Sequence, residues 1–127
     1  MPANGFGTAL KELRVRRTLS QRELGLLSEV DNAYINRLET GEKDNPTAET
    51  VTKLVRALKA SERDTLIFKW LAEHPTTWPD LVSYTLISPG VPYDHFVSAA
   101  GMSFRGEVRP TPASLLARVK RMYDEEE

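Results

Sequence analysis

The residues with the most specific chemistry lie in one short polar segment that follows Asp31. Asn32 and Asn36 are four positions apart, so they would share one face of a helix. An Asn side chain can form two hydrogen bonds with adenine, and an Arg such as Arg37 can do the same with guanine. A small side chain such as Ala33 can touch a thymine methyl group. The segment thus carries side chains suited to nucleobase edges; the alternative is that the two Asn residues are generic polar groups on a helix surface.

Two predicted helices precede and position this segment. The first, over about residues 5–17, places apolar side chains on one face and basic side chains in water. The apolar set is Phe6, Ala9, Leu10 and Leu13, and the basic set is Lys11, Arg16 and Arg17. The second helix begins after Ser20, where Glu23 completes the pattern of a capping box, and it ends near Ser28. A short turn leads to Asp31, the expected N-cap of the third helix.

The third helix is expected to end at Gly41 in a left-handed cap, and two more helices follow it. The fourth begins after Thr47, and the fifth spans about residues 61–73. The predicted buried sets are Ile35 and Leu38 in the third helix, Val51, Leu54, Ala57 and Leu58 in the fourth, and Leu66, Ile67, Trp70 and Leu71 in the fifth. We therefore predict a compact all-α unit of five helices within residues 1–73.

Composition limits the kinds of protein this can be. The chain has 127 residues and a net charge of -1, yet residues 1–60 hold ten Lys or Arg against eight Asp or Glu. Phosphate contacts would therefore come from a local basic patch and helix N-termini. The absence of cysteine excludes disulfides and thiolate zinc sites. Neither a membrane-span-length apolar run nor a signal segment is present, so we expect a soluble, cytoplasmic protein.

Catalytic patterns are missing from the sequence. His74 and His95 are the two histidines, and neither has a second metal ligand at helical spacing. No glycine-rich phosphate loop or serine elbow occurs. We therefore predict no catalytic residue, no metal site and no cofactor, and we do not expect an enzyme.

The chain is predicted to change character at residues 74–79, where two prolines form a linker before a C-terminal domain over residues 80–127. Short helices are expected at about residues 79–86 and 92–100, and a final helix at about 112–124. One side of the final helix carries Leu115, Leu116, Val119, Met122 and Tyr123. A chain this short has little core left to cover them, so we predict that they form the interface of a homodimer.

The N-terminal half resembles the XRE, or lambda-repressor-like, helix-turn-helix family. The residues that carry this resemblance are Leu13-Arg14, Leu19-Ser20-Gln21, Leu24, Ile35, Leu38-Glu39, Gly41 and Asn45-Pro46-Thr47. The resemblance implies binding to double-stranded DNA at a palindromic operator. It implies base contacts by Asn32, Ala33, Asn36 and Arg37, a phosphate contact by Gln21, and an internal ion pair between Arg14 and Glu39. Arg22 and Lys43 are further phosphate-contact candidates.

Some positions depart from that pattern or have a simpler explanation. Glu29 stands where the family usually has Gly, so we expect a turn that is longer or differently shaped. Gly25 stands where Ala is commoner. The alternative for the Arg14 and Glu39 pair is two solvated surface charges, and a solvated face also explains Arg22 and Lys43. The unit as a whole can also be a protein-interaction module without DNA binding.

The region from Trp78 onward resembles DdrO-type DNA-damage-response repressors, which an IrrE-type zinc metalloprotease inactivates. The resembling residues are Pro79-Asp80-Leu81, Thr85-Leu86, Val91-Pro92, His95-Phe96-Val97, the stretch from Phe104 to Pro110, and Arg118 to Arg121. The resemblance implies a scissile bond between Phe104 and Arg105, with Phe104 where the family usually has Leu. The alternative for this stretch is an ordinary connector.

Our leading interpretation is an all-α dimeric transcriptional repressor that proteolytic cleavage inactivates in a DNA-damage response. Its first rival is an antitoxin whose C-terminal region covers a toxin and which represses its own operon. A second rival is a phage-type repressor that cleaves itself, but no region of adequate size for a Ser/Lys dyad follows the DNA-binding unit. The first two interpretations share the DNA-binding half and differ in the protein partner.

Overall fold

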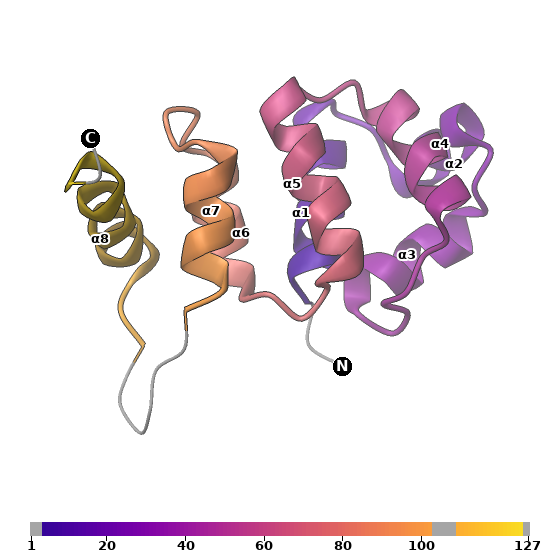
Figure 1. Cartoon of the computed structure of the whole chain (residues 1–127). Coiled ribbons are helices and arrows are strands. Elements are labelled where there is room, and N and C mark those ends of the chain that lie inside the picture. The colour runs from indigo at the N-terminus through magenta and orange to yellow at the C-terminus, as the bar shows by residue number, and fades with distance from the viewer. Residues whose placement is uncertain (1–3, 103–108, 126–127) are drawn as a thin grey trace.

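The computed structural model describes residues 4–102 and 109–125, and all regular elements in these two ranges are helices. They are α1 (Gly5–Arg16), α2 (Gln21–Ser28), α3 (Asn32–Thr40), α4 (Ala48–Leu58), α5 (Glu62–Glu73), α6 (Pro79–Leu86), α7 (Tyr93–Ala100) and α8 (Pro112–Glu125). Figure 1 shows α1 to α5 gathered in one body, with α6 and α7 beside α1 and α5 and with α8 outermost. The predicted all-α class is confirmed.

Local capping chemistry sets most helix ends, and the expected boundaries agree with the observed ones to within one residue. Side chains cap the first five helices at their N-termini, namely Asn4, Ser20, Asp31, Thr47 and Ser61. Each accepts a hydrogen bond from a backbone N–H that the helix itself leaves unpaired. Gly41 ends α3 in the left-handed conformation (φ 84°), which glycine adopts without steric cost.

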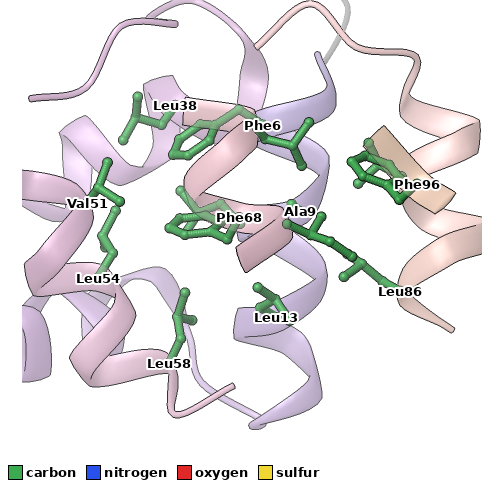
Figure 2. Packing of buried hydrophobic residues seen from close by; sticks show 14 of the residues in the cluster. Phe6, Ala9, Leu13, Leu38, Val51, Leu54, Leu58, Phe68, Leu86 and Phe96 are labelled. Carbon is green, nitrogen blue, oxygen red and sulfur yellow. The ribbon is translucent and has the colours of Figure 1, made fainter. Parts of the chain in front are cut away.

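The N-terminal core is built around two aromatic rings. Phe6 of α1 and Phe68 of α5 stack with their ring centroids 4.8 Å apart, and side chains of α4 close the far side (Figure 2). The predicted face of α1 is buried as expected. In α5 the prediction was wrong for Leu66, which is 42% exposed, and it missed Phe68. The buried positions Asp64, Ile67, Phe68 and Leu71 follow the three-and-four spacing of one helix face, and Leu66 falls outside it.

Two basic side chains of α1 differ from expectation. Lys11 is exposed, as predicted. Arg16 and Arg17 do not simply point into water: Arg17 donates a hydrogen bond to the carbonyl of Ala57, and Arg16 donates to the carbonyl of Leu86 and pairs with a carboxylate. A long side chain can reach such groups from an exposed backbone position, which sequence periodicity does not register.

The C-terminal helices continue the same apolar core. α6 packs against α1, α7 packs against α5, and α8 packs against α6 and α7. Leu86 and Phe96 lie on the opposite side of α1 and α5 from the α4 residues (Figure 2). The division at residues 74–79 remains a prediction, and the parts on either side of it share one buried cluster. No described helix is long and apolar enough to span a membrane.

Candidate nucleic-acid interface

The start of α2 is fixed by a reciprocal pair of hydrogen bonds. The backbone N–H of Glu23 donates to Ser20 Oγ at 3.0 Å, and the backbone N–H of Ser20 donates to Glu23 Oε1 at 2.9 Å. The Ser20 backbone N–H, and then its side chain, lower the pKa of Glu23 because both stabilise the carboxylate. The predicted capping box is confirmed. It leaves Gln21 and Arg22 as the first helical residues, with backbone N–H groups that α2 cannot pair internally.

The turn between α2 and α3 depends on Glu29 and Gly25. Glu29 adopts the left-handed conformation (φ 60°, ψ 31°) that glycine takes more readily. The backbone strain is therefore accommodated at this residue, and three residues, Glu29 to Asp31, connect the two helices. A Cβ atom on Gly25 would lie 2.9 Å from the carbonyl oxygen of Val30. The absence of a side chain at Gly25 thus lets the turn approach α2 closely, which the family's commoner Ala would not allow unchanged.

The helix α3 has one buried and one exposed face. Its buried residues are Ile35, Leu38 and Glu39, whereas the predicted base-contact residues are all exposed, namely Asn32, Ala33, Asn36 and Arg37. Asp31 Oδ1 caps the helix by accepting from the backbone N–H of Ala33 at 3.0 Å. The arrangement holds α3 from behind and leaves four small or polar side chains available on its outer side.

A chain of hydrogen bonds links the interior to that outer side. Arg14 donates to Glu39 through Nε at 2.7 Å and through Nη2 at 2.9 Å, and its Nη1 donates to the carbonyl of Leu19. Gln21 Nε2 donates to Glu39 Oε1 at 3.1 Å, and Asn36 Nδ2 donates to Gln21 Oε1 at 3.3 Å. Hydrogen bonding to Glu39 raises the pKa of Arg14 against the opposing effect of burial. The sequence analysis missed the link between Gln21 and Asn36, because no pattern pairs two amides fifteen residues apart.

The predicted phosphate-contact residues lie at the start of α2 and in the loop after α3. Gln21 and Arg22 open α2, and Lys43 follows α3 in a loop that is held by a hydrogen bond from the Lys43 backbone N–H to the carbonyl of Arg37. Arg22, Arg37 and Lys43 are exposed, and none of them forms an ion pair within the described part of the chain. Their positive charges are therefore not neutralised by neighbouring carboxylates.

The predicted dimer-interface residues of α8 divide into two groups. Leu115, Leu116 and Val119 are buried within this chain, so a second copy is not required to cover them. Met122 is 48% exposed. The ring of Tyr123 lies against His95, with centroids 4.3 Å apart, and its hydroxyl is 3.1 Å from Ser98 Oγ. The predicted cleavage site, Phe104 and Arg105, lies outside the described residues.

A known protein family matches most of the N-terminal helices. Residues 10–64 match the helix-turn-helix family HTH_3. The matched range runs from within α1 into the first turn of α5, so it contains α2, the Glu29 turn and α3, and it covers less than half of the chain. In helix-turn-helix terms, α2 and α3 are the paired helices, and α3 is the second of the pair.

Two relatives from Bacillus subtilis (strain 168) are similar to part of this chain. One is the HTH-type transcriptional repressor RghR, which is 41% identical over 54 residues, 42% of this chain and 40% of the relative. The other is an uncharacterized HTH-type transcriptional regulator, RghRB, which is 37% identical over 54 residues, 42% of this chain and 39% of the relative. The match spans about two fifths of the length of either relative.

Proposed function

We propose that the chain is a sequence-specific transcriptional repressor that binds double-stranded DNA through α3. The observation that carries this proposal is the exposed face of α3, which presents Asn32, Ala33, Asn36 and Arg37 while the opposite face is fixed in the core. A helix whose inner face is packed in the core and whose outer face carries exposed polar groups suits the major groove of B-DNA. The similarity to the repressor RghR supports the same function.

The hydrogen bonding of α3 favours particular base contacts. Asn36 gives one amide N–H to Gln21, so its Oδ1 and its second N–H remain for the N6 and N7 positions of adenine. The guanidinium of Arg37 has no ion-pair partner within the described residues and suits the O6 and N7 positions of guanine. Because Gln21 holds the Asn36 amide, this base-contacting amide is already oriented in the free protein.

Phosphate contacts would come from the ends of the neighbouring elements. Gln21 and Arg22 lie at the N-terminus of α2, where unpaired backbone N–H groups and the helix dipole favour an anion. Lys43, in the loop after α3, supplies an exposed positive charge. We place these three residues on the DNA backbone, where they add affinity without adding sequence preference.

The test begins with selection of bound DNA from a random pool, followed by affinity measurements on the selected site and on variants of it. Asn36→Ala should weaken binding to the selected site by about 1–3 kcal/mol and change the preferred base at one position. Lys43→Ala should weaken binding to all sites alike. It should also reduce the salt dependence of the affinity by the amount expected for about one phosphate contact. Gln21→Ala is a less specific probe of phosphate binding, since Gln21 also orients Asn36.

The control for these variants is Lys69→Ala on α5, an exposed lysine outside the paired helices. It should leave binding unchanged. An equal loss for Asn36→Ala and Lys43→Ala on every sequence would remove Asn36 from base reading. A wild-type chain that selects no sequence at low ionic strength would overturn the proposed function.

We extend the proposal to a homodimer on a palindromic operator. The support is energetic: one short helix offers few base contacts, and joining two copies makes the second binding event intramolecular. Because Leu115, Leu116 and Val119 are covered within the chain, a dimer contact through α8 would use what that helix leaves exposed. Met122 is the large apolar side chain among those groups.

We also propose that a zinc metalloprotease of the IrrE type inactivates the protein in a stress response by cutting between Phe104 and Arg105. The support is the position of α8, whose residues Leu115, Leu116 and Val119 are part of the core that α6 and α7 share. A cut before α8 would leave this packing to a separate fragment of 23 residues. Incubation with such a protease should give one cut, which Phe104→Asp should block, whereas a wild-type band that stays intact would exclude this partner.

A further inference from the structure

A buried carboxylate lies where the helix-turn-helix body meets the C-terminal helices. Asp64, in the first turn of α5, is 4% exposed, and both of its oxygens are bound by arginines. Arg16, the last residue of α1, donates from Nη1 to Asp64 Oδ2 at 2.8 Å. Arg63 donates from Nε and Nη2 to Asp64 Oδ1 at 3.0 and 2.7 Å. We call Arg16, Arg63 and Asp64 the Asp64 joint.

The remaining N–H groups of the two arginines bind the other side of the boundary. Arg16 Nη2 donates to the carbonyl of Leu86 at 3.0 Å. Arg63 donates to three more carbonyls, those of Thr85, Ser88 and Val91, at 2.8–2.9 Å. These four carbonyls end α6 and form the loop that leads to α7. A helix C-terminus has unpaired carbonyls and the negative end of the dipole, so guanidinium groups are well matched to it.

The two arginines contribute unequally. The Arg63 side chain is 18% exposed and makes five hydrogen bonds, whereas the Arg16 side chain is 45% exposed. Water screens a half-exposed ion pair, so Arg63 carries most of the attachment. Asp64 is the common element, because it holds both guanidinium groups in the direction of α6 and offsets their mutual repulsion. Loss of this carboxylate would leave two cations side by side at a partly buried site.

A second attachment lies further along α5. Trp70 meets Phe96 of α7 edge to face, with ring centroids 5.5 Å apart and an interplanar angle of 83°. Trp70 is six residues beyond Asp64, which corresponds to about 9 Å along a helix. Two attachments separated by this distance oppose rotation of α6 and α7 about the linker. The hydrogen bonds of the Asp64 joint add directional contacts to the apolar packing of α6 on α1.

We propose that the Asp64 joint is a positioning cluster that fixes the orientation of α6 to α8 relative to α3 and thereby sets the spacing of the two half-sites that a dimer reads. The claim about half-site spacing rests on the proposed function, whereas the claim about the orientation of the C-terminal helices does not. If the C-terminal helices hold the two copies together, each α3 is placed by whatever connects it to those helices. In this chain that connection includes the hydrogen bonds from Arg16 and Arg63 to the carbonyls at the end of α6 and in the loop after it.

The first test measures orientation without DNA. The chain has no cysteine, so spin labels can be placed on Arg56→Cys in α4 and Ala117→Cys in α8, both exposed positions. The doubly labelled chain is mixed with an excess of unlabelled protein so that a dimer holds at most one labelled copy, and the wild-type background should then give one narrow distance distribution by pulsed electron spin resonance. Asp64→Asn and Arg63→Gln should each broaden it, and Lys53→Met, which breaks an exposed pair with Glu49, should not. Circular dichroism identifies the variants that are folded. If Asp64→Asn does not fold, the distance distribution of Arg63→Gln tests whether the Asp64 joint fixes the orientation.

The second test uses paired half-sites whose separation is changed by one or two base pairs. The wild-type protein should prefer one separation by about tenfold or more, and the joint variants should lose most of that preference. Their affinity for a single half-site should stay within about twofold of wild type, because α3 itself is untouched. A retained narrow distance distribution in folded variants overturns the positioning role. An unchanged spacing preference in the joint variants overturns the effect of the Asp64 joint on half-site spacing. A wild-type chain that binds no DNA refutes the proposed function, and the distance measurement then still tests whether the Asp64 joint fixes the orientation of α6 to α8.

Discussion

Glu39 connects the interior of the helix-turn-helix domain to its exposed face. It is 6% exposed and accepts hydrogen bonds from Arg14 and Gln21, and Gln21 in turn accepts from Asn36. Each hydrogen-bonding step has a structural purpose. Arg14 neutralises the buried carboxylate, the carboxylate orients Gln21, and Gln21 orients the amide that we place against adenine. An isolated exposed Asn would have no such fixed direction and would lose side-chain entropy on binding.

Removal of the Glu39 carboxylate should therefore cost far more than removal of a surface carboxylate. Glu39→Ala leaves the Arg14 charge partly buried without a counter-charge, so the free energy of unfolding should fall by about 3 kcal/mol in urea titrations. The matched control is Glu49→Ala, whose partner Lys53 lies one turn away on the exposed side of α4, and which should cost under about 0.5 kcal/mol. Similar small losses for both variants would mean that the Arg14 pair is no stronger than a solvated one.

At the scale of elements, close approach of backbones decides where α3 lies. A Cβ atom on Gly7 of α1 would lie 2.5 Å from the carbonyl oxygen of Leu38 and 2.7 Å from that of Glu39. The last turn of α3 therefore rests directly on the α1 backbone, and Gly41 ends the helix just beyond this contact. The same principle operates at the other end of the domain, where Gly25 admits the carbonyl of Val30.

Gly7→Ala should consequently destabilise the fold even though alanine favours helix. In an isolated helix the change would add about 1 kcal/mol of stability. Here the added methyl group meets backbone carbonyls that cannot move alone, so we expect a net loss of about 2 kcal/mol in thermal or urea unfolding. Gly90→Ala is the matched control, because a Cβ there meets nothing within 4 Å. A gain in stability for Gly7→Ala would show that α1 and α3 can separate without cost.

The elements that sequence predicts well are those set by local chemistry. Ser20, Asp31 and Thr47 each have a side chain that caps the helix after it, and such caps fix boundaries within a few residues of chain. The turn geometry is less local: the residue type of Glu29 does not favour a left-handed conformation, and the position was singled out through the resemblance, which has Gly there. The choice of Phe68 over Leu66 as a core residue is also non-local, because it depends on which side of α5 meets α1.

At the scale of the whole molecule, an amphipathic sequence pattern shows that one face of a helix is buried. It does not show which part of the protein, or which partner, covers that face. The apolar side of α8 was predicted to be covered by a second copy of the chain, but Leu115, Leu116 and Val119 are buried where α8 packs on α6 and α7 of the same chain. The Asp64 joint had no sequence signal either. Arg16 and Asp64 are 48 residues apart, and charged residues at helix ends are ordinarily solvated. Contacts between distant elements therefore account for most of what sequence did not predict.

The division of α8 into buried and exposed residues determines how dimerisation should be tested. Leu116→Asp would place a charge inside the core, so it should lower the melting temperature and disturb α6 to α8 whether or not a dimer forms. Met122→Asp changes an exposed side chain of the same helix and should leave the circular dichroism spectrum and melting temperature of the protomer unchanged. Under our proposal, Met122→Asp shifts sedimentation from dimer to monomer and lowers affinity for the palindrome at least about tenfold, while single half-site affinity is retained. Arg118→Asp, one turn before Met122 on the exposed side of α8, tests how far such a contact extends. A dimer that survives both substitutions would place the interface on another surface of the chain.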